Sequence, residues 1–234
     1  MPQRGAAALE FTLVMAVLLS VAALVVDAAR WQVTRQVAHL ALMEAARAGS
    51  TGHADPARIR DAFLRALRPL HAGPRGETAG RRLAHSQERI AARMGTVPWR
   101  IEILQPDAQA FHDHAAAGPG HAAPPGGRII DNAYQALQHV RRPDLPASRD
   151  IFRANTLRLR LTYLYQPLLP PLRTLLAGLA ENDGSYTAAA RAQGLAPISI
   201  ELEMEMHSNP ADWLAGPPYP AGVVQGVCRS LRCP

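Results

Sequence analysis

Residues 4–11 read RGAAALEF, and they open an apolar run that continues to Val26. As a helix with a rise of about 1.5 Å per residue, the stretch from Ala6 to Val26 matches the roughly 30 Å hydrocarbon core of a bilayer. Glu10 is the one residue of this stretch that does not suit a membrane helix. The pattern therefore predicts a transmembrane helix with a carboxylate near its start.

Charged residues flank the apolar run, with Arg4 before it and Asp27 and Arg30 after it. Because the part before the run is short and a large domain follows, we expect a cytoplasmic N-terminus and an exported C-terminal domain. A cleaved secretory signal peptide is an alternative, since residues 26–28 loosely fit a small-residue cleavage site. The length of the run and the position of Glu10 argue against it.

The position of Glu10 has a physical explanation if the chain is cut after Gly5. A carboxylate inside a bilayer costs on the order of a few kcal/mol and is usually paired. The cut would give Ala6 a new α-amino group, one helical turn from Glu10. This cationic terminus and the carboxylate, on one subunit or on adjacent subunits, would neutralise each other.

The order of residue types here is basic residue, Gly, three small residues, apolar residue, Glu and aromatic residue, followed by an apolar helix. It resembles the class III signal of type IV pilin-like proteins, and within them the TadE-like minor pseudopilins of Tad pilus systems. The resemblance implies prepilin peptidase cleavage between Gly5 and Ala6, and an assembly role for Glu10. It implies a single-pass inner-membrane protein whose domain lies in the periplasm or at the cell surface. The implied partners are the prepilin peptidase, other pilin-like subunits, the pilus assembly machinery and the lipid bilayer.

The helix is expected to continue beyond the membrane, with Trp31 at the outer interface and Gly49 at its end. Its apolar face is expected to consist of Val33, Val37, Leu40 and Ala41. The resemblance implies the architecture of pilins, in which one long helix lies half in the membrane and half packed on a sheet.

The stretch after this helix is expected to be helical. Asp55 and Pro56 have the composition of a helix start. The apolar face of that helix is expected to consist of Ile59, Phe63, Leu64 and Leu67. A second helix is expected from Arg81 to Met94, with Gly95 ending it.

Three later segments, at residues 99–103, 157–165 and 198–206, alternate apolar and polar residues with the period of two that half-buried strands have. Arginines at 158 and 160 complement glutamates at 201, 203 and 205, so we expect the second and third strands to be antiparallel neighbours. The fold class is α+β. A long N-terminal transmembrane helix continues into a pilin-like domain with an antiparallel sheet of at least three strands and helical insertions.

The expected organisation has five parts. They are a leader at 1–5, a transmembrane helix at 6–27, its continuation at 28–50, a helical insertion at 51–95 and an exported sheet-containing domain at 96–234. Within the last part we expect a flexible loop at 115–127, helices at 128–140 and at 170–193 with a break near Asp183, and a Pro/Gly-rich irregular tail from Ser208 with Trp213 and Tyr219 as anchors.

Composition limits the function further. The formal net charge is +6. The 25 Lys and Arg positions are all arginine, and they are spread along the whole chain among Asp and Glu, so we predict no nucleic-acid binding. Cys228 and Cys233 are the two cysteines. Export would favour a disulfide between them, with free thiols as the alternative, and the spacing is poor evidence for zinc.

The sequence contains no hydrolase, metalloprotease, phosphate-loop or dinucleotide motif. His112, Asp113, His114 and His121 lie close together, but a flexible loop preorganises metal ligands poorly. We therefore predict no catalytic residue, no metal site and no cofactor. The predicted function is a non-catalytic, membrane-anchored pseudopilin that takes part in assembly of a Tad-type adhesive pilus. The alternatives are a single-pass anchor or scaffold subunit of a secretion or conjugation envelope complex, and a secreted binding module.

Overall fold

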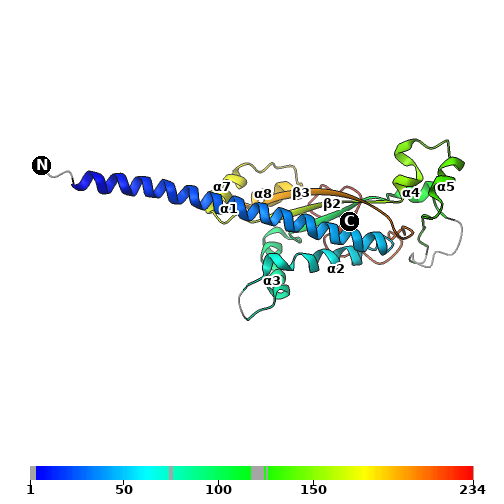
Figure 1. Cartoon of the computed structure of the whole chain (residues 1–234), viewed down its shortest axis with the longest axis horizontal. Coiled ribbons are helices and arrows are strands. Elements are labelled where there is room, and N and C mark those ends of the chain that lie inside the picture. The colour runs from blue at the N-terminus through cyan, green and yellow to red at the C-terminus, as the bar shows by residue number, and fades with distance from the viewer. Residues whose placement is uncertain (1–3, 74–75, 117–123, 125, 234) are drawn as a thin grey trace.

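The computed structural model describes residues 4–73, 76–116, 124 and 126–233, and in them one long helix, α1 (Arg4–Thr51), protrudes from a domain built on a sheet (Figure 1). In the described residues, four strands form this sheet in the order β3-β2-β1-β4. The strands are β1 (Trp99–Gln105), β2 (Thr156–Tyr165), β3 (Ala196–Glu205) and β4 (Val223–Gln225). β2 pairs antiparallel with both β1 and β3, and β4 pairs parallel with β1. The α+β class and the antiparallel sheet of at least three strands are confirmed, and the parallel strand in the tail is an addition.

The C-terminal half of α1 packs on the domain mainly through small side chains. Its buried apolar residues are Ala38, Ala41, Leu42, Ala45 and Ala46. The face expected from the sequence is correct at Ala41, half-buried at Val37, and wrong at Val33 and Leu40, which are 53% and 57% exposed. The sheet supplies large buried leucines from β2, so the helix faces it with alanines, which let the two elements approach closely.

Gly49 lies at a point of close approach between α1 and its neighbours. A Cβ at this position would lie 2.7 Å from Leu157 Cδ2 and 2.9 Å from Ile59 Cγ1. The helix continues to Thr51, so the expectation that Gly49 ends it is wrong. Ser50 then fastens the helix end to the end of β3, since its Oγ donates to the Glu205 carbonyl at 2.6 Å.

Two helices follow α1 as the sequence predicts, α2 (Pro56–Ala66) and α3 (Ala79–Met94), with a short 3-10 helix, η1 (Arg68–His71), between them. The Asp55 side chain accepts a hydrogen bond from the Ala57 N–H at 2.8 Å, which caps α2. Of the expected apolar face, Ile59, Phe63 and Leu67 are buried, and Leu64 is half-buried. These side chains join α1 and the sheet in the main hydrophobic core.

The expected pairing of β2 with β3 is confirmed, and its charges face one another. Arg158 lies opposite Glu203, and Arg160 lies opposite Glu201. Glu201 accepts from Arg158 Nη2 at 2.8 Å and from Arg160 Nε at 2.6 Å. These two hydrogen bonds hold the pKa of the Glu201 carboxyl below its ordinary value. Because the pairs are partly exposed, each contributes up to about 1 kcal/mol to the free energy of unfolding.

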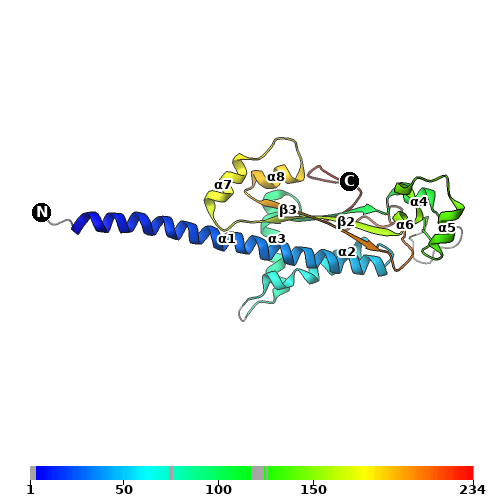
Figure 2. The ribbon, with the colours of Figure 1, turned by 45° about the horizontal axis from the view of Figure 1, so that its top comes forward.

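The expected helix at 128–140 is wrong in its first half. The helix there, α5 (Gln135–Arg141), is preceded by single bridges that join Ile129 to Ala211 and Ile130 to Ala115. The backbone of this stretch pairs with the tail, since the Ile130 N–H donates to the Pro210 carbonyl at 3.0 Å. The neighbouring elements are α4 (Ala108–Asp113), η2 (Ala147–Arg149) and α6 (Ile151–Ala154). Helices α4, α5 and α6 gather at the end of the domain far from the protruding helix (Figure 2).

The expected helical stretch at 170–193 consists of α7 (Pro170–Gly178) and α8 (Tyr186–Ala192), and the expected break lies between them. Most of the expected flexible loop, residues 117–123 and 125, lies outside the described residues, as do residues 1–3 of the expected leader. The division of the chain into five parts stays a prediction.

The close approach at Gly49 predicts that Gly49→Ala lowers the free energy of unfolding by about 1–2 kcal/mol, because the added methyl group must displace Leu157 or Ile59. Thermal unfolding of the detergent-solubilised full chain, followed by circular dichroism, measures the change. Gly178→Ala is the matched control, since a Cβ at that helical glycine meets nothing within 4 Å. A Gly49→Ala protein as stable as the control would contradict the packing described here.

Candidate functional site: the N-terminal helix and its anchor

The first half of α1 stands clear of the domain. From Glu10 to Val26 the described side chains are exposed, apart from a half-buried Ala23. The large apolar side chains more than half exposed in this stretch are Phe11, Leu13, Val14, Val17, Leu18, Leu19, Val21, Val25 and Val26. In the part of the chain that the structure describes, α1 is the one helix long and apolar enough to cross a membrane. A membrane supplies the apolar surroundings that this surface lacks in water.

The residues of the expected cleavage signal lie at the tip of this helix. The backbones of Gly5 and Ala6 belong to α1, and the Glu10 side chain is exposed on it. Ala6 and Glu10 are one turn apart, about 6 Å along the helix axis. An α-amino group on Ala6 would thus lie within reach of the Glu10 carboxylate of the same or a neighbouring helix. The cut and the pairing themselves stay predictions.

Asp27 marks the point where α1 enters the domain, and it is only 3% exposed. Its Oδ1 accepts hydrogen bonds from the Tyr165 hydroxyl and, at 3.2 Å, from the Leu168 N–H. Burial and then the hydrogen bond to Asp27 raise the pKa of Tyr165 to about 12, so the hydroxyl keeps its proton and donates. The sequence shows only an acid after an apolar run. Its partners lie 138 and 141 residues away, so the sequence gives no sign of this anchor.

A second polar cluster lies on the face of β1 that points away from the main hydrophobic core. Arg100 and Glu102 share the polar face of β1, and they are only 6% and 5% exposed because the C-terminal segment covers them. Arg100 donates to three carbonyls of that segment, each at 2.9 Å, those of Cys228, Ser230 and Leu231. Its guanidinium also lies 4.2 Å from the centroid of the Tyr186 ring. Burial lowers the pKa of Arg100 from its ordinary value.

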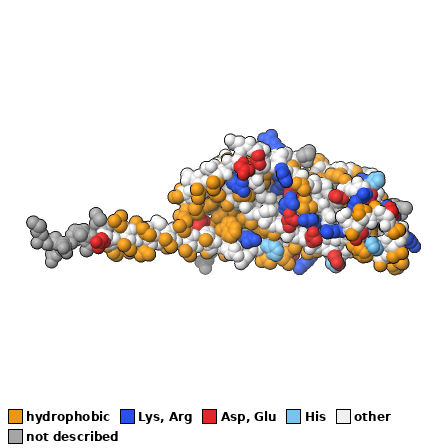
Figure 3. Space-filling model, turned by 90° about the horizontal axis from the view of Figure 1, so that it is seen from above, with side chains coloured by type: hydrophobic (Ala, Val, Ile, Leu, Met, Phe, Trp, Pro, Cys, Tyr) orange, Lys and Arg blue, Asp and Glu red, His pale blue; other side chains and the backbone are white. Residues whose placement is uncertain are grey.

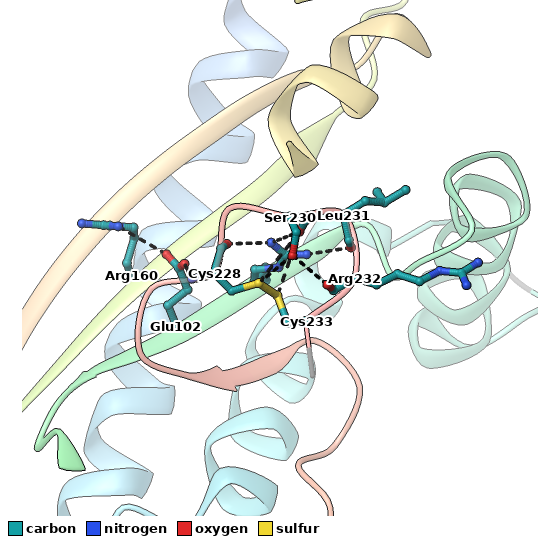
Figure 4. Close-up of a disulfide and its surroundings, with 8 residues drawn as sticks. Glu102, Arg160, Cys228, Ser230, Leu231, Arg232 and Cys233 are labelled. Carbon is teal, nitrogen blue, oxygen red and sulfur yellow. Dashed lines mark hydrogen bonds and ion pairs between the residues drawn. A yellow bond between two sulfur atoms is a disulfide. The ribbon is translucent and has the colours of Figure 1, made fainter. Parts of the chain in front are cut away.

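A disulfide closes the segment that Arg100 and Glu102 hold. Cys228 and Cys233 are joined with an S–S distance of 2.03 Å, and the Ser230 and Leu231 carbonyls lie within the loop they close (Figure 4). Glu102 accepts from the Cys228 N–H at 2.7 Å. Side chains at alternate positions of β1 face opposite sides of the sheet, so this loop lies on the side away from the main core. The disulfide lies in the domain, whereas the expected cleavage signal lies at the tip of α1, so the two are separate parts of the molecule.

The histidine cluster noted in the sequence is held by structural contacts. Arg149 Nε donates to Asp113 Oδ2 at 2.8 Å, and the hydrogen bonds from Arg149 lower the pKa of Asp113 to about 2. The His114 ring bonds to the Arg149 carbonyl at 2.9 Å, and His121 lies outside the described residues. Among the described residues no group of three His, Cys, Asp or Glu side chains is placed to hold a metal ion.

The Asp27 anchor predicts that Tyr165→Phe lowers the free energy of unfolding by about 1–3 kcal/mol, because the buried carboxylate loses a donor. Thermal unfolding of the full chain in detergent measures the loss. Tyr134→Phe is the control, since that ring is 80% exposed. Equal stability of the two variants would remove the hydrogen bond as a support of the helix.

Comparison with known proteins agrees with the geometry of α1. The family model for TadE-like proteins matches residues 5–47, which begin at the glycine of the expected cleavage signal and end near the C-terminus of α1. No curated protein and no solved structure matches the chain. Along residues 5–47 the chain is therefore similar to TadE-like proteins, and this similarity supports involvement in assembly of a Tad pilus.

Proposed function

We propose that the chain is a membrane-anchored pseudopilin that takes part in assembling a Tad-type adhesive pilus and catalyses no reaction. One observation carries this proposal. The segment that matches the TadE-like family, residues 5–47, forms a helix whose first half is exposed and apolar, with Glu10 near its start. A helix of this kind can pass from the bilayer into a fibre by lateral contacts alone, since both surroundings accept apolar side chains.

The proposed orientation has the N-terminus in the cytoplasm and the domain in the periplasm or at the cell surface. The Cys228–Cys233 disulfide supports it, because such bonds persist in oxidising compartments and are rare in the cytosol.

The proposed assembly step is lateral packing of α1 against the helices of other pilin-like subunits. Ala16, Ala22 and Ala23 are small residues on the span that let two helices approach closely. Prepilin peptidase would first cut between Gly5 and Ala6. The new α-amino group of Ala6, on the same or an adjacent subunit, would then pair with Glu10, which reduces the cost of a carboxylate in lipid.

The ionisable groups of the domain support a non-catalytic role. The two carboxyls with a pKa held low by arginines, Asp113 and Glu201, form structural ion pairs on partly exposed surfaces. Arg100 binds backbone carbonyls of its own chain. These contacts stabilise the fold, and they keep all three groups bonded to other parts of the same chain.

If the chain is cut between Gly5 and Ala6, the mature protein is expected to start at Ala6. Mass spectrometry of the protein purified from membranes measures its N-terminus. A start at Met1 or Pro2 would instead support an uncut anchor or scaffold subunit of another envelope complex. A start at Ala29 would support the secreted binding module and exclude a membrane-anchored pseudopilin.

The pairing of Glu10 predicts that Glu10→Ala and Glu10→Gln are both cut normally but enter the pilus assembly at least about tenfold less well. Removing one partner of a desolvated ion pair costs about 3 kcal/mol or more, and the glutamine variant removes the charge alone. Co-purification with the assembled pilus fraction measures incorporation.

Glu44→Ala is the matched control for these variants, because Glu44 is an exposed glutamate on the same helix beyond the span and pairs only with Arg47 in the described residues. Its incorporation is expected to equal that of the unmodified protein. Normal incorporation of Glu10→Gln would rule out charge pairing as the role of Glu10.

A further inference from the structure

Helix α7 is rich in leucine, yet none of its side chains, all of them described, is buried. Leucines at 172, 175, 176 and 179 recur at the spacing of one helix face. Leu175 and Leu179 are 58% and 63% exposed, and Leu168, just before the helix, is 46% exposed. Single exposed leucines are common on soluble domains, but three on one short segment form an apolar patch that needs a partner. Leu168, Leu175 and Leu179 are called the leucine patch below.

The anchor at Asp27 fixes where this patch lies relative to the membrane span. The Asp27 carboxylate binds the Tyr165 hydroxyl and the Leu168 N–H, so the segment that leads into α7 is fastened to the residue at which the exposed part of α1 ends. Figures 1 and 2 both place α7 beside α1, at the end of the domain from which the helix protrudes. In the space-filling view of Figure 3, hydrophobic side chains continue from the protruding helix onto that end of the domain.

The one charged side chain of α7 is turned back to the protein. Arg173 donates through Nε to the Pro167 carbonyl at 2.7 Å and through Nη2 to the Leu168 carbonyl at 3.1 Å. The backbone of α7 also comes close to Gly194, where an added Cβ would lie 2.8 Å from Arg173 Cβ. The arginine side of α7 therefore faces the domain, and the most exposed leucines are left to contact something outside it.

Residues of α1 at the same level suit a membrane–water interface. Trp31, one turn after Asp27, is 37% exposed, and the Arg35 guanidinium lies 5.8 Å from the centroid of its ring. Tryptophan is enriched where a span meets water, and arginine reaches lipid headgroups from such positions.

We propose that the leucine patch lies in the outer interface of the bilayer, so that the domain has a second contact with lipid beside the spanning helix. The occupant is lipid because α7 lies at the end of the domain from which α1 protrudes, where hydrophobic side chains continue from the helix onto the domain (Figure 3), and because the Leu168 N–H is fastened to Asp27, where the exposed part of α1 ends. Two contacts fix the tilt of the domain on the membrane, because a single spanning helix can tilt in the bilayer. The inference rests on the membrane-anchored part of the proposed function and does not depend on pilus assembly.

Three single-cysteine variants of the full chain test the proposal, and their residues have nearly equal exposure in the structure. Leu18→Cys reports on the span, Leu175→Cys on the leucine patch, and Leu137→Cys on α5 at the far end of the domain; the exposed fractions are 57%, 58% and 57%. Each cysteine is labelled under non-reducing conditions, which leave the Cys228–Cys233 disulfide intact, with an environment-sensitive NBD fluorophore. The proteins are placed in lipid nanodiscs without quencher, with lipids that carry a shallow nitroxide quencher, and with lipids that carry a deep one, because position 18 lies near the middle of the expected span.

The deep quencher is expected to quench position 18, the shallow quencher is expected to quench position 175 about twofold or more, and neither is expected to quench position 137. An amphipathic face in the interface lies near the shallow part of the acyl chains. Quenching at 18 without quenching at 175 would overturn the inference and leave the membrane anchor standing. Equal quenching at 175 and 137 would also overturn it, since the label itself would then be binding lipid. No quenching at 18 would remove the anchor, and the inference with it. A blue-shifted emission at 175 that lipid does not quench would assign the patch to a protein partner instead.

Discussion

One continuous helix has to satisfy two different surroundings, and the rest of the structure depends on how it does so. The first half of α1 offers large apolar side chains on all sides, which suits lipid or the helices of other subunits. The second half buries four alanines and Leu42 against the domain, and Gly49 allows a close contact with Leu157 and Ile59. The change occurs at Asp27, whose buried carboxylate is held by Tyr165 and Leu168. Since the helix is unbroken, a force on the span is passed directly to the sheet.

The sheet is held from both faces by different means. On one face, α1 and α2 supply apolar side chains, and the Phe63 and Trp99 rings pack with centroids 5.1 Å apart. On the other face, the disulfide-closed C-terminal segment supplies backbone carbonyls to the guanidinium of Arg100. A buried arginine with three carbonyl acceptors is stable only while those acceptors stay in place, and the disulfide restricts the loop that carries them.

The functional inferences all concern the end of the molecule nearest the membrane. The match to TadE-like proteins covers α1, while the sheet and the helices around it follow no matched protein. The proposed roles of Glu10 in subunit pairing and of the leucine patch in lipid contact belong to two levels of one membrane-embedded region. The first would act at the inner end of the span and the second at its outer end, so each can be tested without disturbing the other.

The sequence by itself determined the parts of this protein that depend on local pattern. The apolar run with Glu10 predicted the exposed helix, period-two alternation predicted β1, β2 and β3, and arginines opposite glutamates predicted that β2 and β3 are neighbours. Only the tertiary structure decided which face of α1 packs, why Gly49 is a glycine, that β4 pairs with β1, and that Arg100, Glu102 and Asp27 are buried. The reason is physical: periodicity records which side chains share a face, whereas burial of that face depends on segments more than a hundred residues away.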